Sequence, residues 1–511
     1  MRKSNDSLFE LVHHLTKGEK KFFHQFVKHL QKEGKSSLYQ LFSLIEKQRV
    51  YDEAKLKKEL TGKLFSSNFS QAKAELYKLL LKSLRVYHHN HTAPVEINDS
   101  LSNFEILRLH GLYRDSLESI DKFSEKSAPV DYPSLRIQMN DMLFRNAIRS
   151  NDPEQLLLMQ HDFRQRQENI LAGLSDLVKI QDCFIRVYQM LRLSGLQNTT
   201  EGRNRLKEIV GELDAIRIDE NTPEPNRYWY WVTYFFYHYC LGELQQSKVF
   251  AEIIIQFFES KEEKDLMVYD QIVIYATNLF NLEISSENMK KAMEQYTRVK
   301  EIWKKYPILE QEAKFYRINS NLLQLYMYQG DFDACLLLSS SMEGKINLNT
   351  KDQHALISLL FNIIWAHLFT GHVKKIIKYL DHIINQGQQK VSSDFVLLSR
   401  IIQMIVYVED KNLSLLNSSV LSMERFLKKA KRMDPSLEVL MSFFKNYFRH
   451  LPSHQEQSVY LALKERILKI PDVQSHLLYR MPQVLIWIQS KITGESAVSL
   501  STLNKYTNFW H

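Results

Sequence analysis

The sequence predicts an all-α protein in which an N-terminal helical bundle precedes a series of repeated helical hairpins. Composition is the first observation behind this prediction, because the 511 residues include only 14 glycines and 11 prolines. Both levels lie well below the usual values of about 7% and 5%, and few residues remain for the tight turns of a strand-rich chain. The second observation is a near-constant spacing of helix-breaking residues. Since 44% of the residues are hydrophobic and 25% are charged, the balance is that of a globular protein and excludes disorder and collagen-like structure.

Charge is distributed unevenly along the chain. Residues 1–90 hold 18 Lys and Arg against 9 Asp and Glu, a net charge of +9, whereas the rest of the chain carries a net charge of −1. A polar stretch from His88 to Ser100 follows the basic segment and marks a domain join. We therefore divide the chain into a basic helical bundle (1–90), a helical repeat array (91–460) and C-terminal capping helices (461–511).

The basic bundle begins with a recognisable helix start. Thr16 and Glu19 have the spacing of a capping box, in which hydroxyl and carboxylate each satisfy an amide of the first turn. This predicts a helix that continues through Leu30. Periodicity predicts three further helices, at Ser37–Lys47, Asp52–Leu60 and Ser70–Tyr87.

The last of these helices carries a basic stripe. Lys78, Lys82 and Arg85 lie on one side of it, opposite Leu76, Leu80, Leu84 and Tyr87. Such a stripe can neutralise phosphates of nucleic acid, although a solvated helix face is the commoner explanation and no helix-turn-helix signature accompanies it. Attachment to a membrane surface is a weaker hypothesis, because the segment lacks bulky residues that insert at an interface.

Two stretches of the bundle, Leu15–Phe23 and Tyr77–Arg85, resemble the start of a group of uncharacterised bacterial helical-repeat proteins. The resemblance implies a helical bacterial protein and carries no activity.

Candidate turns recur through the rest of the chain. They fall at Gly111, Asn151, Gly195, Gly242, Ser286, Gly330, Gly371, Asp410 and His450. Successive turns are 39 to 47 residues apart, and each separates a long apolar-periodic helix from a second amphipathic helix. An even spacing of this kind is typical of stacked helical hairpins.

The clearest repeat surrounds Gly330, where one apolar helix ends and another begins at Phe332. It resembles a tetratricopeptide repeat (TPR): Tyr326 matches the family's tyrosine, Phe332 its turn aromatic and Cys335 its small residue where two helices touch. Two other units match more loosely, one with His367 and Ile376 at the tyrosine and small-residue positions, the other with Ser247 at the small-residue position. Because the period exceeds the family's 34 residues, we expect a TPR-like solenoid with longer helices.

The resemblance implies a concave groove lined by the first helix of each hairpin. In TPR proteins, a basic residue at position two and an asparagine at position six of that helix clamp a carboxylate and a peptide backbone. Arg317 and Asn321 match these positions in one repeat, and Ser358 and Asn362 occupy them in the next, where only the asparagine matches. The alternative is an ordinary helix surface, or an asparagine that satisfies a local backbone group.

An aromatic segment at 228–239 provides a second candidate surface. Nine of its twelve residues are aromatic, and Trp229, Thr233, Phe236 and Cys240 share one side of the helix. If that side faces the groove, Trp229 and Phe236 offer apolar contact to a partner. A helix that is aromatic all round is, however, more often buried between its neighbours.

The sequence contains no motif that points to catalysis or a cofactor. GxGxxG, GxxxxGK[ST], HExxH, GxSxG and an EF-hand loop are all absent. His88, His89 and His91 are the only dense histidine cluster, and without neighbouring Cys or acidic residues a solvated linker is the commoner explanation than a metal site. We therefore expect neither an enzyme nor a bound metal or cofactor.

We expect a cytoplasmic protein. The first residues lack the apolar core of a secretory signal, and the three cysteines show no CxxC spacing. The longest apolar stretch, Ala355–Gly371, is too short and too interrupted to span a membrane, and predicts a helix buried in protein. Together these observations predict a protein- or peptide-binding scaffold. The alternative function is a peptide- or ligand-responsive regulator whose basic bundle contacts nucleic acid.

Overall fold

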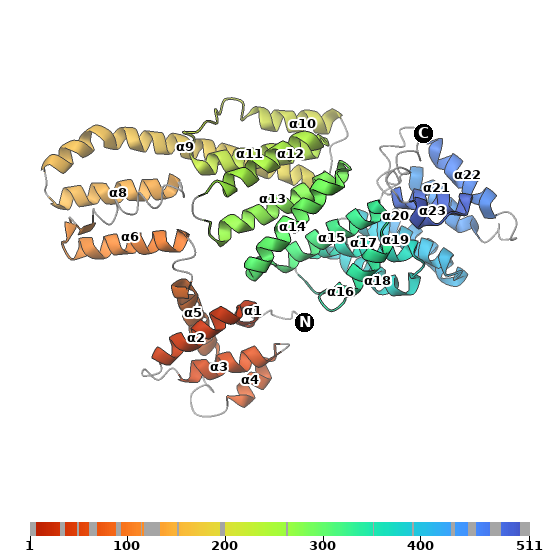
Figure 1. Cartoon of the computed structure of the whole chain (residues 1–511), viewed down its shortest axis with the longest axis horizontal. Helices are drawn as coiled ribbons and strands as arrows, with labels where there is room; N and C mark the ends of the chain where they lie inside the picture. The colour runs from red at the N-terminus through yellow and green to blue at the C-terminus, as the bar shows by residue number, and fades with distance from the viewer. Residues whose placement is uncertain are drawn as a thin grey trace. The chain divides into compact units, whose positions relative to one another are not determined.

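The structure, a computed structural model, is entirely helical in the residues that it describes (Figure 1). Since no described residue lies in a β-strand, the predicted all-α class is confirmed. The described residues are 7–30, 36–48, 51–60, 69–87, 93–113, 115–116, 133–150, 153–194, 200–261, 264–350, 352–390, 393–430, 435–447, 456–470 and 482–500.

The chain divides into two compact units, each of which is described by itself. Unit 1 comprises Met1–Cys183, Glu212–Tyr230 and Phe258–Asp270, and unit 2 comprises Phe184–Gly211, Trp231–Phe257 and Gln271–His511. The domain join expected at 88–100 lies partly outside the described residues and stays a prediction.

The N-terminal bundle belongs to unit 1. Its helices are α1 (Ser7–His14), α2 (Lys17–Leu30), α3 (Ser36–Lys47), α4 (Glu53–Glu59) and α5 (Phe69–Tyr87). Their apolar faces meet in a common core that contains Phe23, Phe42 and Leu76. The predicted capping box is confirmed: Thr16 N donates to Glu19 Oε2 at 2.7 Å, and Glu19 N donates to Thr16 Oγ1 at 3.2 Å.

Three long helices follow the bundle: α6 (Ala93–Leu109), α8 (Pro133–Ser150) and α9 (Pro153–Ser194). The repeat spacing predicts two helices between residues 151 and 195, and this prediction is wrong, because α9 is one helix of 42 residues. A neighbouring segment of the chain packs against Gly173 in α9. Its carbonyl accepts a bond of 2.8 Å from Asn226 Nδ2, and a Cβ at Gly173 would lie 3.5 Å from Pro223.

Hairpins with one shared turn geometry follow. Their helices are α10 (Thr200–Gly211), α11 (Glu224–Leu241), α12 (Leu244–Glu259), α13 (Leu266–Ser285), α14 (Met289–Lys305), the 3₁₀ turn η2 (Pro307–Leu309), α15 (Glu312–Gln329), α16 (Phe332–Met342), α17 (Gln353–Phe369), α18 (Val373–Lys390), α19 (Ser393–Glu409) and α20 (Leu413–Ala430). The described C-terminal helices are α21 (Pro435–Asn446), α22 (Glu456–Leu468), α23 (Pro482–Thr493) and α24 (Ala497–Leu500).

A residue with positive φ ends the first helix of each of five hairpins. These residues are Gly242, Glu287, Gly330, Gly371 and Lys411, with φ between 54° and 78°, and they recur every 40 to 45 residues. At each of them the chain makes the same pair of backbone bonds. At Gly330, for example, Gly330 N donates to Met327 O and Asp331 N donates to Tyr326 O, the pattern of a Schellman motif.

The turn positions expected from the sequence are largely correct. Gly111, Gly242, Gly330 and Gly371 all have positive φ, as a helix-ending glycine requires. Ser286 and Asp410 also lie in turns, as expected, and in each of these turns the next residue, Glu287 or Lys411, adopts the left-handed conformation. Asn151, Gly195 and His450 lie outside the described residues.

In three of these hairpins the residue after the turn also caps the second helix. Asp331 Oδ1 accepts a bond from Ala334 N at 3.0 Å, and Asn412 Oδ1 accepts one from Leu415 N at 3.2 Å. The Asn288 side chain caps α14 in the same way. A single short polar residue therefore donates its amide to the end of one helix and caps the next helix with its side chain. The loop between the two helices is short for this reason.

Small residues bring the two helices of a hairpin into contact, as the repeat pattern predicts. Ser247 Oγ donates to Phe235 O at 3.1 Å, and Cys335 Sγ donates to Leu323 O at 3.7 Å. Each bond spans 12 residues across a turn, so Ser247 and Cys335 hold equivalent positions in two hairpins.

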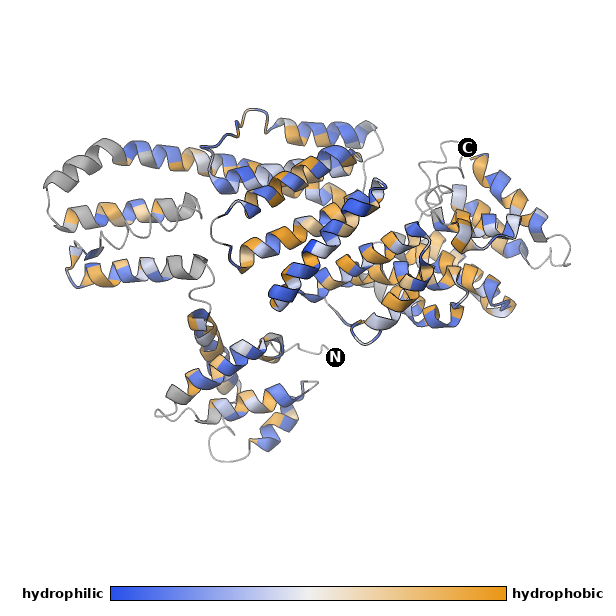
Figure 2. Cartoon of the chain, viewed as in Figure 1, coloured by the Kyte–Doolittle hydropathy of each residue, from blue (hydrophilic) through white to orange (hydrophobic). Residues whose placement is uncertain are grey.

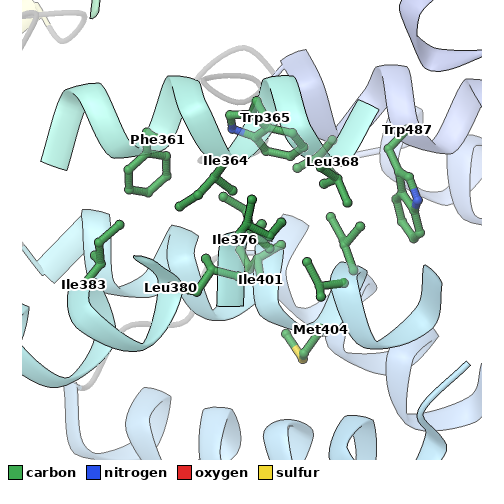
Figure 3. Close-up of a cluster of buried hydrophobic side chains, with 14 of the residues drawn as sticks. Phe361, Ile364, Trp365, Leu368, Ile376, Leu380, Ile383, Ile401, Met404 and Trp487 are labelled. Carbon is green, nitrogen blue, oxygen red and sulfur yellow. The ribbon is translucent and has the colours of Figure 1, made fainter. Parts of the chain in front are cut away.

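The main core of unit 2 lies around α17. Figure 3 shows Ile364 and Leu368 of α17 pointing toward Ile376 and Leu380 of α18, with Ile401 of α19 beside them. Most side chains of α17 are buried, so the expectation that Ala355–Gly371 is a helix buried in protein is confirmed. In the described parts of the chain, we find no helix with the length and apolar character that crossing a membrane demands.

Some second helices, in contrast to α17, bury only one side. Of α14, for example, Ala292, Val299 and Trp303 are buried, and Figure 2 shows hydrophilic residues over most of the remaining surface of this helix. This one-sided pattern is the one expected of an amphipathic helix at the edge of a core.

The C-terminal helix α23 packs into the same core. Its Trp487 contacts Tyr460 and Phe443 with ring centroids 5.4 and 6.4 Å away. The indole Nε1 donates to Glu409 Oε1 at 2.6 Å, and Lys491 Nζ lies 2.8 Å from the same carboxylate oxygen. The end of α19 is therefore tied to α23.

We predict that Gly371→Ala lowers the stability of the chain by about 1 kcal/mol, because an L-residue with a Cβ is strained at positive φ. Nothing lies within 4 Å of the added Cβ, so the loss comes from the backbone alone. The measurement is the apparent melting temperature followed by circular dichroism. Gly344→Ala is the matched control, since that glycine also has open space but no positive φ, and an equal loss in both variants would contradict this account.

Candidate functional site

The candidate groove residues lie on α15 and α17, two first helices that pack against each other. Arg317 and Asn321 are four residues apart on α15 and so share one face of the helix. Arg317 is exposed, and its guanidinium has no ion pair with any described residue. It is therefore free to bind an anionic group of a partner.

Asn321 is half-buried and points toward the preceding first helix. Its Nδ2 donates to the Thr277 carbonyl of α13 at 3.2 Å, and its Oδ1 lies 3.4 Å from Asn281 Nδ2. The amide thus joins α15 to α13, as in the alternative that an asparagine satisfies a backbone group.

Asn362 repeats this arrangement one hairpin later. Its Nδ2 donates to both the carbonyl and the hydroxyl of Ser320 on α15, each at 2.9 Å. Its Oδ1 has no recorded partner among the described residues and can still accept a bond. Ser358, one turn earlier on α17, donates its hydroxyl to His354 O at 3.1 Å. We call Arg317, Asn321, Ser358 and Asn362 the first-helix face.

The two aromatic candidates are half-buried and belong to different units. Trp229, in unit 1, packs edge-on against Tyr228 with ring centroids 5.3 Å apart. Phe236, in unit 2, packs against Tyr188 at 5.2 Å and Phe235 at 4.8 Å.

Other members of the same helical stripe are completely buried. Thr233 and Cys240 each have 0% exposure, so the expectation that they face a groove is wrong. Burial of these two residues favours the alternative that the aromatic segment packs inside the protein.

The basic stripe of α5 lies at the surface of the bundle. Lys78, Lys82 and Arg85 are exposed, whereas Leu76 and Leu80 on the opposite side are buried. None of the three cations has an ion pair with a described residue. Their charges are therefore not neutralised within the described part of the bundle.

Another basic residue of α5 is fully engaged. Lys73 Nζ lies 2.9 Å from Glu53 Oε2, and Lys57 Nζ lies 2.8 Å from Glu53 Oε1. Hydrogen bonds from Lys57, Lys73 and Tyr51 lower the pKa of Glu53 to about 2. Glu53 therefore stays ionised and neutralises lysines near α4.

The described residues provide little evidence for a metal site or a reactive thiol. No group of three or more His, Cys, Asp or Glu residues is placed to hold a metal ion there. The candidate cluster His88, His89 and His91 lies outside the described residues. Cys183, Cys240 and Cys335 are buried free thiols, and burial raises the pKa of Cys240 and of Cys335 to about 12. Both of these thiols therefore stay protonated and are poor nucleophiles.

One histidine of the core has a strongly changed environment. His367 is buried in α17, and its Nε2 lies 3.1 Å from Ser339 Oγ of α16. Burial, with the positive charge of Lys375, lowers the pKa of His367 to about 4. This side chain is therefore a neutral imidazole packed between α17 and α16.

Sequence reasoning missed one basic surface of α2. Lys17, Lys20, Lys21 and His24 line a pocket, although the sequence indicated these residues only as the start of a helix. Their spacing of three and four residues was the available signal, since such residues share one helix face.

Comparison of the chain with protein-family models, with curated proteins and with solved structures finds no match.

The depressed pKa of His367 predicts a dependence of stability on pH. Between about pH 4 and 6.5 the unfolded state binds a proton that the folded state does not, so this contribution is complete above pH 6.5 and is lost as the pH falls through that window. Melting temperatures measured from pH 4 to 7 check this. In His367→Gln, whose amide can still bond Ser339 but does not titrate, the dependence should be smaller. An unchanged dependence in this variant would assign it to other groups.

Proposed function

We propose that the chain is a non-catalytic scaffold that binds a protein or peptide partner through a TPR-like array of helical hairpins. The exposed, unpaired guanidinium of Arg317 is the observation that carries this proposal. The equivalent turn bonds at 40- to 45-residue spacing support the array.

Arg317 and Asn362 divide the recognition between them. The planar guanidinium of Arg317 donates two parallel hydrogen bonds to a carboxylate of the partner. Asn362 accepts a bond from a partner amide at its remaining Oδ1, because its Nδ2 is held by Ser320. Asn321 contributes to the packing of α15 on α13 and is secondary in recognition.

A non-catalytic role agrees with the state of the buried thiols. Burial raises the pKa of Cys240 and of Cys335 to about 12. A thiol with such a pKa supplies almost no thiolate at neutral pH.

Reversing the charge of Arg317 should weaken binding of the partner. We expect Arg317→Glu to reduce capture of specific partners from a lysate of the native cells by about tenfold or more, because a carboxylate then meets a carboxylate. Quantitative mass spectrometry measures the captured proteins. Lys374→Glu is the matched control, since Lys374 is exposed on the second helix α18 and lies outside the first-helix face. Equal capture by Arg317→Glu and the unchanged chain would remove this face from the proposal.

A second function is favoured by the α5 stripe. Lys78, Lys82 and Arg85 are exposed and unpaired, so they can neutralise successive phosphates of DNA or RNA. In this alternative the chain is a regulator that contacts nucleic acid through its bundle while the array binds a peptide or other ligand.

Salt titration tests the alternative. If the stripe contacts phosphates, affinity for DNA or RNA should fall steeply with salt, and changing Lys78, Lys82 and Arg85 to Glu should reduce the slope of log K against log salt by about three. Deletion of residues 1–90 should abolish binding. Affinity that is independent of these residues would exclude this function for the stripe.

A further inference from the structure

The N-terminal bundle contains a pocket that neither candidate function uses. Its volume is about 460 Å³, and it lies between α2 and α3. It is lined by Lys17, Lys20, Lys21, His24, Gln25 and Glu46. Pockets for small ligands commonly measure about 300 to 1,000 Å³, so this one has room for a compact ligand.

The sequence of α2 places the cations in one row. Lys17, Lys20, Lys21 and His24 follow the pattern i, i+3, i+4, i+7, so they share a face, while Phe23 and Val27 are buried in the bundle core. At the start of α2, the Glu19 carboxylate accepts bonds from the Thr16 amide and hydroxyl. Glu19 is thus engaged in the capping box, and the pocket lining itself is supplied by the lysine side chains.

Positive charge exceeds negative charge in the pocket lining. Lys20 Nζ lies 3.2 Å from Glu46 Oε1, and Glu46 is the only acidic lining residue. Lys17 and Lys21 are exposed and have no ion pair with any described residue. Two cations are thus available for an anionic ligand.

His24 adds a directed donor. Its ring packs edge-on against Tyr39 and Phe42, with centroids 5.2 and 5.5 Å away. Its Nδ1 is shielded from solvent and has no hydrogen-bond partner in the described structure. The other ring nitrogen, Nε2, is therefore the one left to bond a ligand.

We propose that this pocket binds a small phosphorylated anion of about the size of a diphosphate. Lys17 and Lys21 neutralise the phosphate oxygens, Lys20 is shared with Glu46, and His24 and Gln25 donate hydrogen bonds. The site lies within unit 1 and does not depend on the first-helix face.

Isothermal titration of the full chain with inorganic pyrophosphate tests the proposal. We expect saturable binding at one site, and we expect Lys17→Glu combined with Lys21→Glu to weaken it about tenfold or more, because two attractions become repulsions. Both residues are exposed, and a Glu at position 17, in the first turn of α2, is favourable, so the variant should fold. Lys55→Glu combined with Lys58→Glu on α4 makes the same change of charge outside the pocket and should leave the affinity within about twofold.

A second variant should change the affinity for pyrophosphate in the opposite direction. Glu46→Gln removes the only carboxylate of the lining and frees Lys20, so pyrophosphate should bind several-fold more tightly. Absence of saturable binding, or equal weakening by the pocket and control pairs, would overturn the proposal.

A single-stranded oligonucleotide separates the two sources of phosphate. A small-anion site binds pyrophosphate in the absence of nucleic acid, and pyrophosphate does not displace an oligonucleotide held by α5. If the chain binds only the oligonucleotide, and the pocket variant weakens that binding, the lysines serve a nucleic-acid surface and the small-anion site is refuted.

Discussion

The left-handed residue at the end of each first helix is the constraint on which the hairpins of this protein depend. It reverses the chain with two backbone hydrogen bonds, and at Asn288, Asp331 and Asn412 the next residue caps the second helix. Because the residue that caps the second helix also belongs to the turn, the turn fixes the residue at which the second helix begins. The small residues Ser247 and Cys335 then fall at equivalent contacts 12 residues from their acceptors. The positions of Arg317 and Asn362 on their helices follow from the same turns.

The predictability of these turns depended on the residue that makes them. Gly330 and Gly371 could be recognised from sequence, because glycine is the residue that adopts positive φ without strain. Glu287 and Lys411 adopt the same conformation, but nothing in their side chains indicates it, so the sequence predicted the turns there without the residue that takes positive φ. The continuous helix α9 was missed for a different reason. The turn spacing implies two helices between Asn151 and Gly195, but spacing alone does not show whether the chain breaks between two turns, and α9 continues through this segment.

The chemistry of the first-helix face could be predicted only in part. Helical periodicity is local, and it places Arg317 and Asn321 on one face from sequence alone. The partner of Asn321 is 44 residues away in the chain, so its bond to Thr277 depends on how closely α15 approaches α13. The same is true of Asn362 and Ser320. An asparagine bonded to a neighbouring helix adds order to the packing and loses donors for a ligand, whereas an exposed arginine keeps its donors.

The net charge of the bundle does not show which of its basic residues are paired with a carboxylate and which are not. Glu53 binds Lys57 and Lys73 near α4, and Glu46 binds Lys20 beside the pocket, so these carboxylates neutralise particular lysines. Among the described residues, unpaired cations include two separate rows, Lys17 and Lys21 on α2 and Lys78, Lys82 and Arg85 on α5. The α2 row borders a recess with a histidine donor, which suits a compact anion, while the α5 row is an open helix face that suits an extended chain of phosphates. A net charge of +9 therefore describes two surfaces with different geometries, and geometry rather than charge decides which anion each can hold.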